Sequence, residues 1–419
     1  MHRDDHQYRQ WAVDEMHLRR FVPVPDHCEI YQSVRLMNDT DRRDEDARLV
    51  ADKPAFDEWN AASRFASGSR DAGIRFLWER HTEASTITLI FPNDCPDGVR
   101  AAYLRWFHEW DGAVIRATRI FVVPDEDEID RHLDRHEIDR AEMICCDVAP
   151  GVRIWSDFGI HSDGFGRLMV SAGEVSSHER GRVIQRVQEL GNYRNMALLG
   201  LPTVRQHVPA VDALERQLSD HAEHVARASD GEADDDLLEQ LVDLSSQLEL
   251  IRAATEFRLS ATEAYGSVAA DRLQTLNVEA VANHQTLSDF TERRLVPALR
   301  TCSVFRDRLG RIAERIARVM QTLDVRIDTR IKAQNLRLTT SMERSIQLQF
   351  RLQGLVETLS VIAAGYYLVG LIAYMIKGAA ALPSGSLSDI LIGAITLPAI
   401  CLIYLLVRHK RGTMLKDED

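Results

Sequence analysis

Two short segments near the N-terminus carry side chains that could bind a metal ion or a small ligand. Carboxylates and imidazoles ligate divalent metals and exchange protons near neutral pH. The candidates, on a predicted early helix and at the end of a predicted strand, are Glu15, His17, Glu79, Arg80, His81 and Glu83. On a strand, Glu79, His81 and Glu83 would share one face, opposite Arg80. The simpler alternative is a salt-bridged surface without a ligand.

A second group of charged side chains lies on a predicted helix further along the chain. Arg182, Arg186 and Arg194 share this helix with Glu189. Arginines of this kind form ion pairs with a neighbouring domain or bind an anion. The sequence leaves both alternatives open.

Motifs of common catalytic sites are missing from the sequence. It has no nucleophile elbow, P-loop, GxGxxG, HExxH or EF-hand string, and its six cysteines include no CxxC pair. We therefore expect no enzymatic activity. We also expect no cofactor, apart from a divalent metal ion of undefined identity at the carboxylate and imidazole groups.

The composition separates an acidic body from a neutral C-terminal region. The 419-residue chain has a formal net charge of -13, and residues 358–419 contain nearly equal numbers of acidic and basic side chains. The excess negative charge therefore lies on the N-terminal part. Nucleic-acid binding requires clustered Lys and Arg, so we expect no nucleic-acid partner.

Two stretches near the C-terminus have the length and composition of membrane spans. Residues 358–376 and 390–407 contain no Asp, Glu, Lys or Arg. A helix of about 18 residues spans roughly 27 Å, close to the thickness of the hydrocarbon core. The alternative, a buried hydrophobic hairpin in a soluble protein, rarely has two such stretches. We therefore predict two transmembrane helices in the lipid bilayer.

Basic residues predict the orientation of these spans. They precede the first span and follow the second: Arg337, Arg344, Arg351, Arg408, Lys410 and Arg411. The loop between the spans, residues 377–389, holds one basic residue, Lys377. Because loops rich in Lys and Arg stay in the cytoplasm, we expect a multi-pass protein with both termini cytoplasmic.

A long helix leads into the first span. No proline occurs between Pro297 and Pro383, so we predict a helix from about residue 298 to residue 376. Its first part carries apolar residues three or four positions apart, the pattern of a coiled coil. These residues are Leu309, Ile312, Ile316, Val319, Leu323, Ile327 and Ile331.

Toward the membrane, the same face of the predicted helix becomes partly polar. We call this face the seam, and its candidate axis-lining residues are Asn335, Met342, Ser345, Gln349, Ala363, Tyr367, Gly370 and Tyr374. Mixed hydroxyl, amide and apolar side chains suit a narrow, partly hydrated axis between symmetry-related helices. In the alternative, the polar residues only set the register of a coiled coil.

The first 175 residues show the patterns of an α+β domain. Predicted strands cover residues 74–80, 85–91, 113–123, 143–148, 152–160 and 166–170, and predicted helices cover 8–19, 99–110 and 125–140. The run Ser162-Asp163-Gly164 predicts a hairpin turn, so the sheet is at least partly antiparallel. The predicted domains are an α+β cytoplasmic domain (1–175), a helical stalk (176–357), two transmembrane helices (358–407) and a cytoplasmic tail (408–419).

Several stretches resemble a bacterial family of uncharacterised membrane-anchored proteins, defined as a domain of unknown function. They are residues 14–19 (DEMHLR), 77–83 (LWERHTE), 155–158 (WSDF), 181–186 (GRVIQR), 193–199 (YRNMALL), 293–298 (RRLVPA) and 356–361 (VETLSV). The resemblance covers nearly the whole chain. It implies a location in the bacterial inner membrane and brings no established activity.

The layout is also similar to that of CorA-type metal-ion transporters. In that group an α/β cytoplasmic domain leads into a very long helix, which becomes the first of two spans in a pentamer. The similarity implies a homo-oligomer, a pentamer if it holds in full. The Gly-Met-Asn motif of that group is absent, however, and residues 374–378 (YMIKG) stand at the outer end of the first span. A ring of Lys377 side chains at this outer mouth would repel cations.

Three functions are therefore compatible with the sequence. The first is a homo-oligomeric ion channel or transporter gated by its cytoplasmic domain. The second is a membrane-anchored coiled-coil sensor or scaffold without transport. The third, a membrane-tethered enzyme, requires a pocket at which Glu79, His81 or His17 converge.

Overall fold

The structure is a computed structural model of the whole chain. It describes residues 6–17, 21–51, 53–62, 64–70, 73–136, 138, 140, 143–227, 234–378, 394, 398 and 401–405, and at residues 14, 15, 17 and 376–378 it describes the backbone alone. The chain divides into two compact units. The first unit comprises Met1–Ala228 with Asp235–Met320, and the second comprises Ser229–Asp234 with Gln321–Asp419.

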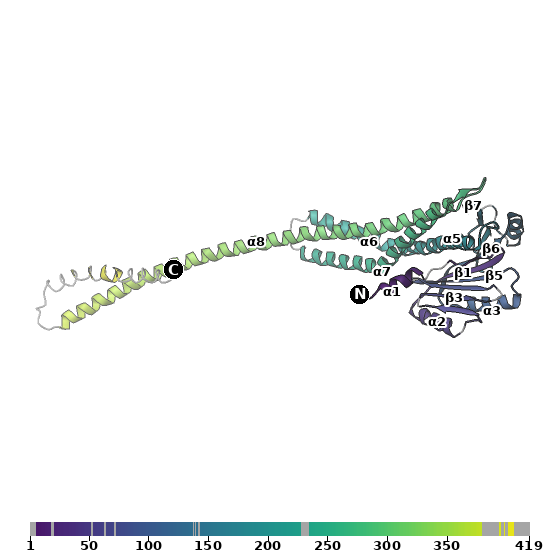
Figure 1. Cartoon of the computed structure of the whole chain (residues 1–419). Coiled ribbons are helices and arrows are strands. Elements are labelled where there is room, and N and C mark those ends of the chain that lie inside the picture. Colours follow the sequence, from purple (N-terminus) through teal and green to yellow (C-terminus); the bar gives the residue numbers. More distant parts are fainter. Residues whose placement is uncertain are drawn as a thin grey trace. The chain divides into compact units, whose positions relative to one another are not determined.

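The first unit contains a mixed sheet of ten strands in the described part of the chain (Figure 1). The strands are β1 (Cys28–Leu36), β2 (Glu58–Ala61), β3 (Phe65–Ser69), β4 (Arg75–Arg80), β5 (Ala84–Pro92), β6 (Ala113–Val123), β7 (Ile144–Ala149), β8 (Val152–Ser156), β9 (Gly166–Ser171) and β10 (Glu279–Ala280). Their order is β10-β7-β8-β9-β6-β1-β5-β4-β3-β2. Neighbouring strands are antiparallel except β6 and β9, which are parallel. The predicted α+β class is thus confirmed.

The central strand of the sheet is β1, which the sequence did not predict. It pairs with both β5 and β6, and both of its faces are buried. Its polar residues break the apolar pattern by which a buried strand is recognised. Each has a partner: Gln32 donates to the Thr88 hydroxyl at 3.1 Å, and Glu29 pairs with Arg100 and Arg119.

The predicted strand over residues 152–160 is shorter in the structure. β8 ends at Ser156, because Phe158 adopts a left-handed conformation with φ of 51° that a strand cannot continue. The predicted turn follows at Ser162-Asp163-Gly164, where Gly164 has φ of 82° and donates to the His161 carbonyl at 2.9 Å. β8 and β9 pair antiparallel, as the turn predicts.

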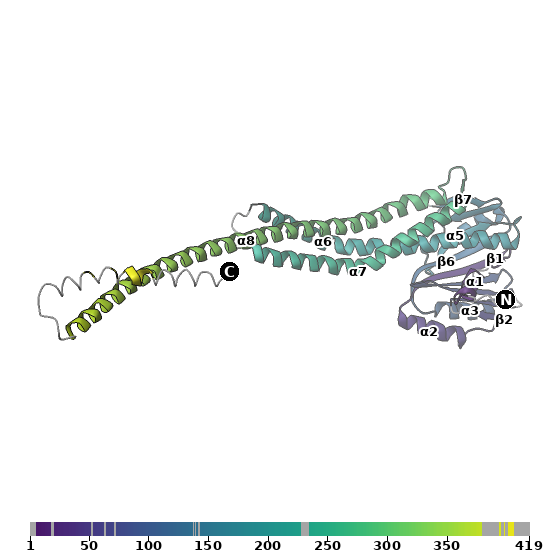
Figure 2. The ribbon, with the colours of Figure 1, turned by 60° about the vertical axis from the view of Figure 1, so that its left-hand side comes forward.

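Helices cover both faces of the sheet. They are α1 (Arg9–His17), α2 (Asp39–Val50), α3 (Asp97–His108), η1 (Glu126–Glu128), α4 (Ile129–Arg135), α5 (Ser177–Leu198), α6 (Gly200–Arg227), α7 (Asp234–Thr275) and α8 (Leu287–Gly378). α5 packs on one face through Val183, Ile184, Val187 and Leu190. On the other face, α2 and α3 cover β3–β5 (Figure 2). α4 packs on the same face near β7 and β9 through Ile129 and Leu133.

Three long helices run side by side in the first unit: α6, α7 and the first part of α8 (Figure 1, Figure 2). Arg308 of α8 pairs with Asp212 and Glu215 of α6 at 2.6 Å, and Arg306 of α8 pairs with Glu263 of α7 at 2.5 Å. The predicted stripe residues Leu309, Ile312 and Ile316 are buried here. Charged pairs at the rim and apolar side chains inside therefore hold this bundle together.

α8 begins at Leu287 and not near residue 298, and Pro297 lies inside the helix. A proline inside a helix costs about 3 kcal/mol because it lacks a donor and crowds the preceding turn. The first turns of α8 bury Leu287 and Leu295 in the core between α5 and the sheet. Burial of two leucines offsets much of this cost, which explains why the helix starts before the proline.

In the second unit, α8 continues from Gln321 to Gly378 and is long and apolar enough, by length and composition, to cross a membrane. Near the start of this unit, Arg326 pairs with the buried Asp234 at 3.3 Å. The large apolar side chains that follow along α8 are exposed, among them Leu338, Met342, Leu352 and Tyr374. The predicted second span, residues 390–407, lies largely outside the described residues, as does the tail.

Candidate functional site

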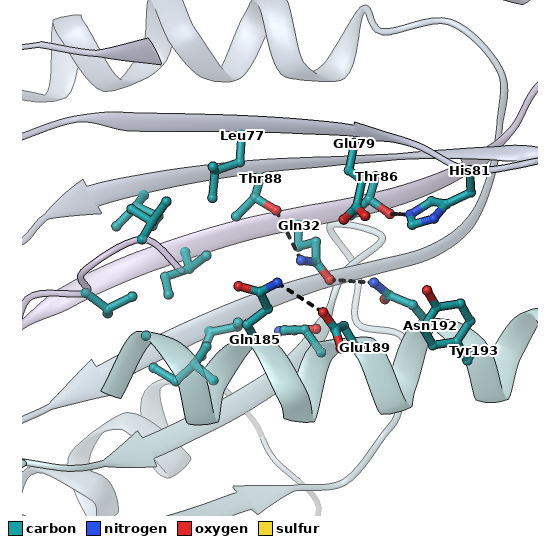
Figure 3. A pocket seen from close by; sticks show the side chains of 18 of the residues that line it. Gln32, Leu77, Glu79, His81, Thr86, Thr88, Gln185, Glu189, Asn192 and Tyr193 are labelled. Carbon is teal, nitrogen blue, oxygen red and sulfur yellow. Dashed lines mark hydrogen bonds between the residues drawn. The ribbon is translucent and has the colours of Figure 1, made fainter. Parts of the chain in front are cut away.

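A pocket between α5 and the sheet contains several of the residues selected from the sequence (Figure 3). Its free volume is about 90 Å³, room for a few water molecules or a very small ligand. The sheet wall comes from β1, β4 and β5, and the opposite wall is one face of α5. We call it the α5 pocket.

Amide, hydroxyl and imidazole groups line the sheet wall of the α5 pocket. Gln32 donates to the Thr88 hydroxyl at 3.1 Å, and the His81 Nε2 lies 2.9 Å from the Thr86 hydroxyl. The strand alternation of β4 brings Leu77 and Glu79 to the same wall (Figure 3). A ligand in the α5 pocket would contact these hydrogen-bonding groups and also apolar side chains of the wall, such as Ile30, Ile90 and Ile184.

The helix wall presents side chains one turn apart. Gln185 donates to Glu189 at 3.0 Å, and Asn192 donates to the Gln32 side-chain oxygen at 3.1 Å. The second Glu189 oxygen accepts from Arg272 of α7 at 2.6 Å. Because Glu189 contacts both the pocket and α7, it links a ligand in the pocket to the helical bundle of the first unit.

Arg80 points away from the α5 pocket, as expected from its position on the strand. It pairs with Glu45 of α2 at 3.2 Å, and Glu45 is fully buried. Glu45 also accepts from the indole nitrogens of Trp78 at 2.7 Å and Trp110 at 3.1 Å. Arg80 therefore has a structural role in holding α2 against the sheet.

Glu83 lies in the turn between β4 and β5 and also points elsewhere. Both of its oxygens accept from Arg258 of α7, at 2.9 Å and 2.6 Å. Of the six candidates, the structure thus brings Glu79 and His81 into one pocket and gives Arg80 and Glu83 ion-pair partners. The side chains of Glu15 and His17 lie outside the described residues.

In the described part of the chain, no group of three or more His, Cys, Asp or Glu side chains is arranged to hold a metal ion. The arrangement of the α5 pocket suits a small polar ligand that both donates and accepts hydrogen bonds. Its amides, Gln32, Gln185, Gln188 and Asn192, were missed by sequence reasoning. Glutamine and asparagine carry no sequence signal for binding, and only the fold brings these four together.

The seam residues of α8 lie in the second unit. The side chains of Asn335, Met342, Ser345, Gln349, Ala363, Tyr367 and Tyr374 are exposed, and Gly370 is partly exposed. Lys377 lies in the last turn of α8, and its side chain lies outside the described residues.

A model of a protein family, described as "Protein of unknown function (DUF3422)", matches residues 4–414. The match confirms the resemblance to a domain of unknown function that the sequence indicated. No curated protein matches the chain.

Proposed function

We propose that this chain, which belongs to the DUF3422 family, is a homo-oligomeric inner-membrane protein of CorA-like layout. In this proposal the α8 helices of several copies, five if the similarity holds in full, surround a common axis. Two transmembrane helices anchor each copy in the lipid bilayer, and both termini are cytoplasmic. Ligand binding in the cytoplasmic domain controls the passage of an ion along the axis. We assign the protein no catalytic step and no nucleic-acid partner.

The observation that carries this proposal is the exposed apolar surface of α8 in the second unit, which includes the seam residues Met342 and Tyr374. From Leu336 to Tyr374 the helix exposes one large apolar side chain after another, including Leu338, Phe350 and Leu352. Soluble monomers rarely expose such a continuous apolar surface. Lipid covers the part within the span, and further copies of α8 cover the part before it.

The polar residues of α8 fall into two groups, which also supports the proposal. Thr339, Thr340, Thr358 and Ser360 donate to the carbonyl four residues earlier, at 2.6–2.9 Å. These hydroxyls are satisfied within the helix and tolerate apolar surroundings. By contrast, the side chains of the seam residues Asn335, Ser345 and Gln349 have no hydrogen bond to the described part of the chain. Water on an axis, or another α8, would supply their partners.

Two ion pairs offer a route from the α5 pocket to the helical bundle. Glu189 joins the pocket wall to Arg272, and Glu83 joins the β4–β5 turn to Arg258. Both arginines belong to α7. A ligand-induced shift of α5 or of the β4–β5 turn would therefore act on α7. This connection is the physical basis for the proposed control by the cytoplasmic domain.

A membrane-anchored sensor or scaffold without transport is the second candidate. It is favoured by Lys377 in the last turn of α8, because a ring of lysines at an outer mouth opposes cation entry. In this candidate the spans are only anchors, and either the axis between the α8 helices is closed and dry or the protein is a dimer. The ligand pocket is the same as in the first candidate.

Disulfide cross-linking tests the assembly on the seam. In a Cys401→Ser background, Ser345→Cys should form cross-linked dimers of the full-length protein in membranes under mild oxidation. Glu343→Cys is the matched control, since both residues are exposed and two positions apart, on nearly opposite faces of α8. Equal cross-linking at both positions, or none at Ser345→Cys, would contradict packing through the seam.

Ion flux separates the two candidates. The purified protein in liposomes should pass an ion, and Lys377→Asn should raise cation flux by removing the repulsion. Zero flux for both proteins, with the seam cross-link intact, would reject transport and leave the sensor or scaffold.

A further inference from the structure

A second, larger cavity lies in the first unit, between α5 and the part of the sheet formed by β6 and β9. Its free volume is about 270 Å³, close to the lower limit for pockets that bind small molecules. Three arginines, Arg116, Arg167 and Arg194, line it, and no Asp or Glu is among the described residues of its wall. We call it the arginine cavity.

Arg116 of β6 has one side of its guanidinium fully engaged. Its Nη1 donates to the side-chain oxygens of Gln188 and Asn192 and, at 3.4 Å, to that of Gln32. All three partners are neutral amides. Within the described part of the chain, its Nε and Nη2 have no hydrogen bond and no carboxylate partner. Burial and the charge of Arg194 lower the pKa of Arg116 to about 9.

Arg194 of α5 is the second unusual group. It is 7% exposed, and its Nη1 is buried without any hydrogen-bond partner among the described residues. Its guanidinium lies over the rings of Phe158 at 4.5 Å and Phe290 at 5.1 Å. Contact with two ring faces positions the group but leaves its in-plane donors unused. Burial and the charge of Arg294 lower the pKa of Arg194 to about 10.

Arg167 adds a third donor. Its Nη2 pairs with Asp163 at 2.7 Å and its Nη1 donates to the Phe165 carbonyl at 3.2 Å, but its Nε is buried without a partner. Asp163 balances the charge of Arg167. The charges of Arg116 and Arg194 are therefore the ones that have no counterpart in the described protein.

Arg194 is buried and Arg116 is partly buried, and neither has a charged partner in the described protein. Such groups are costly, because a charge that leaves water needs an opposite charge or several hydrogen bonds. The same guanidinium groups would bind an anion that enters the cavity, since their donors match the oxygens of carboxylate and phosphate. The rest of the wall is largely apolar and includes Val187, Leu190 and Leu287. Such a wall suits the carbon skeleton of an organic anion.

We propose that the arginine cavity binds a small organic anion, whose carboxylate or phosphate oxygens accept from Arg116, Arg194 and the Arg167 Nε, with its carbon skeleton against the apolar wall. The site does not depend on transport or on assembly through α8. It does adjoin the α5 pocket, since Gln188 and Asn192 line that pocket and hold Arg116.

Thermal unfolding of the detergent-extracted, full-length protein tests this proposal. Inorganic phosphate and succinate are titrated separately at constant ionic strength, with chloride as the reference anion. At least one of the two should raise the Tm in a saturable way. A rise with phosphate alone identifies a phosphate ligand, a rise with succinate alone a carboxylate ligand, and both support the site. No saturable rise with either anion would overturn the proposal.

Variants locate the site. Arg194→Gln should abolish the anion-dependent rise, whereas Arg182→Gln should keep it, because Arg182 lies on the same helix but pairs with Glu179 at the surface. Should Arg194→Gln fail to fold, Arg116→Lys keeps the charge with fewer donors and should weaken binding at least tenfold. An unchanged response in Arg194→Gln, or in Arg116→Lys where that variant replaces it, would show that the anion binds elsewhere.

Discussion

Arg116 of β6 packs directly against Gly191 of α5, and a Cβ at Gly191 would lie 2.8 Å from the guanidinium carbon of Arg116. This contact is possible only because α5 presents bare backbone at that position. It lets Gln188 and Asn192, on either side of Gly191, reach the same guanidinium. Because Gly191 has no side chain, α5 can approach the sheet closely at this position.

Gly191→Ala should destabilise the first unit by about 1–3 kcal/mol, because the added methyl group displaces a guanidinium whose Nη1 donates to three side-chain oxygens. All six tryptophans belong to residues 11–155, so tryptophan fluorescence during urea unfolding reports this unit. The Tm of the detergent-extracted protein should fall as well.

Gly310→Ala is the control for this substitution. Gly310 also lies inside a helix, α8, and nothing lies within 4 Å of a Cβ placed there. Because alanine favours the helix over glycine, Gly310→Ala should leave stability unchanged or raise it by up to about 1 kcal/mol. A loss of stability in Gly310→Ala as large as that in Gly191→Ala would contradict the account of the Arg116 contact.

Glu45 should contribute more to stability than the other acidic residues of α2, most of which are exposed. It is fully buried and accepts from Trp78, Trp110 and Arg80. Glu45→Gln replaces one acceptor oxygen by a donor that faces other donors, so we expect a loss of about 1–3 kcal/mol. Urea unfolding followed by tryptophan fluorescence measures it, and the emission spectrum should change because two indoles lose their partner.

Asp46→Asn is the matched control. Asp46 pairs with the same Arg80, but its side chain is 59% exposed. Exposed ion pairs contribute little, so the expected loss is below about 1 kcal/mol. Equal losses for Glu45→Gln and Asp46→Asn would show that burial of the carboxylate is unimportant.

Much of the α+β domain follows from sequence patterns, but β1, β2, β3 and α2 were not predicted. The strands at 75–80, 84–92 and 113–123 alternate or form apolar runs and were predicted within one or two residues. β1 was missed because its Glu29, Gln32 and Arg35 are buried. Their partners, such as the Phe107 and Trp110 carbonyls for Arg35, come from distant elements that no local pattern reveals.

The candidate site could be predicted only in part, for a related reason. Strand alternation separated Glu79 and His81 from Arg80, and the structure places Glu79 and His81 in the wall of the α5 pocket and pairs Arg80 with Glu45. The sequence did not show which of these side chains line a pocket, because α5 forms the opposite wall and α7 supplies the partner of Glu83, and both helices are distant in sequence. The amides Gln32 and Asn192 and the unpaired state of Arg194 follow from packing, which a single sequence does not show.

His136 should make the first unit less stable in mild acid. Its ring stacks on Phe121 at 4.1 Å, and burial together with Arg119 and Arg167 lowers its pKa to about 4 from an ordinary value of 6.5. Between pH 6.5 and pH 4 the unfolded chain binds a proton at this site more readily than the folded chain. Stability is therefore lost as the pH falls through this window.

Replacing His136 tests this pH dependence. Between pH 7 and pH 4, the Tm of the His136→Gln variant should fall less than the Tm of the wild type. His284→Gln serves as the control, since His284 is exposed, and it should follow the wild-type curve. An equal drop for His136→Gln and the wild type would mean that this imidazole makes no contribution.

The mass of the detergent-extracted complex shows whether copies of the chain assemble through α8. Light scattering corrected for bound detergent gives the number of 47.5 kDa chains in each particle. Assembly through α8 predicts one defined ring of three or more chains, a pentamer if the CorA-like layout holds in full. A monomer, or a dimer whose α8 helices do not meet, would contradict it.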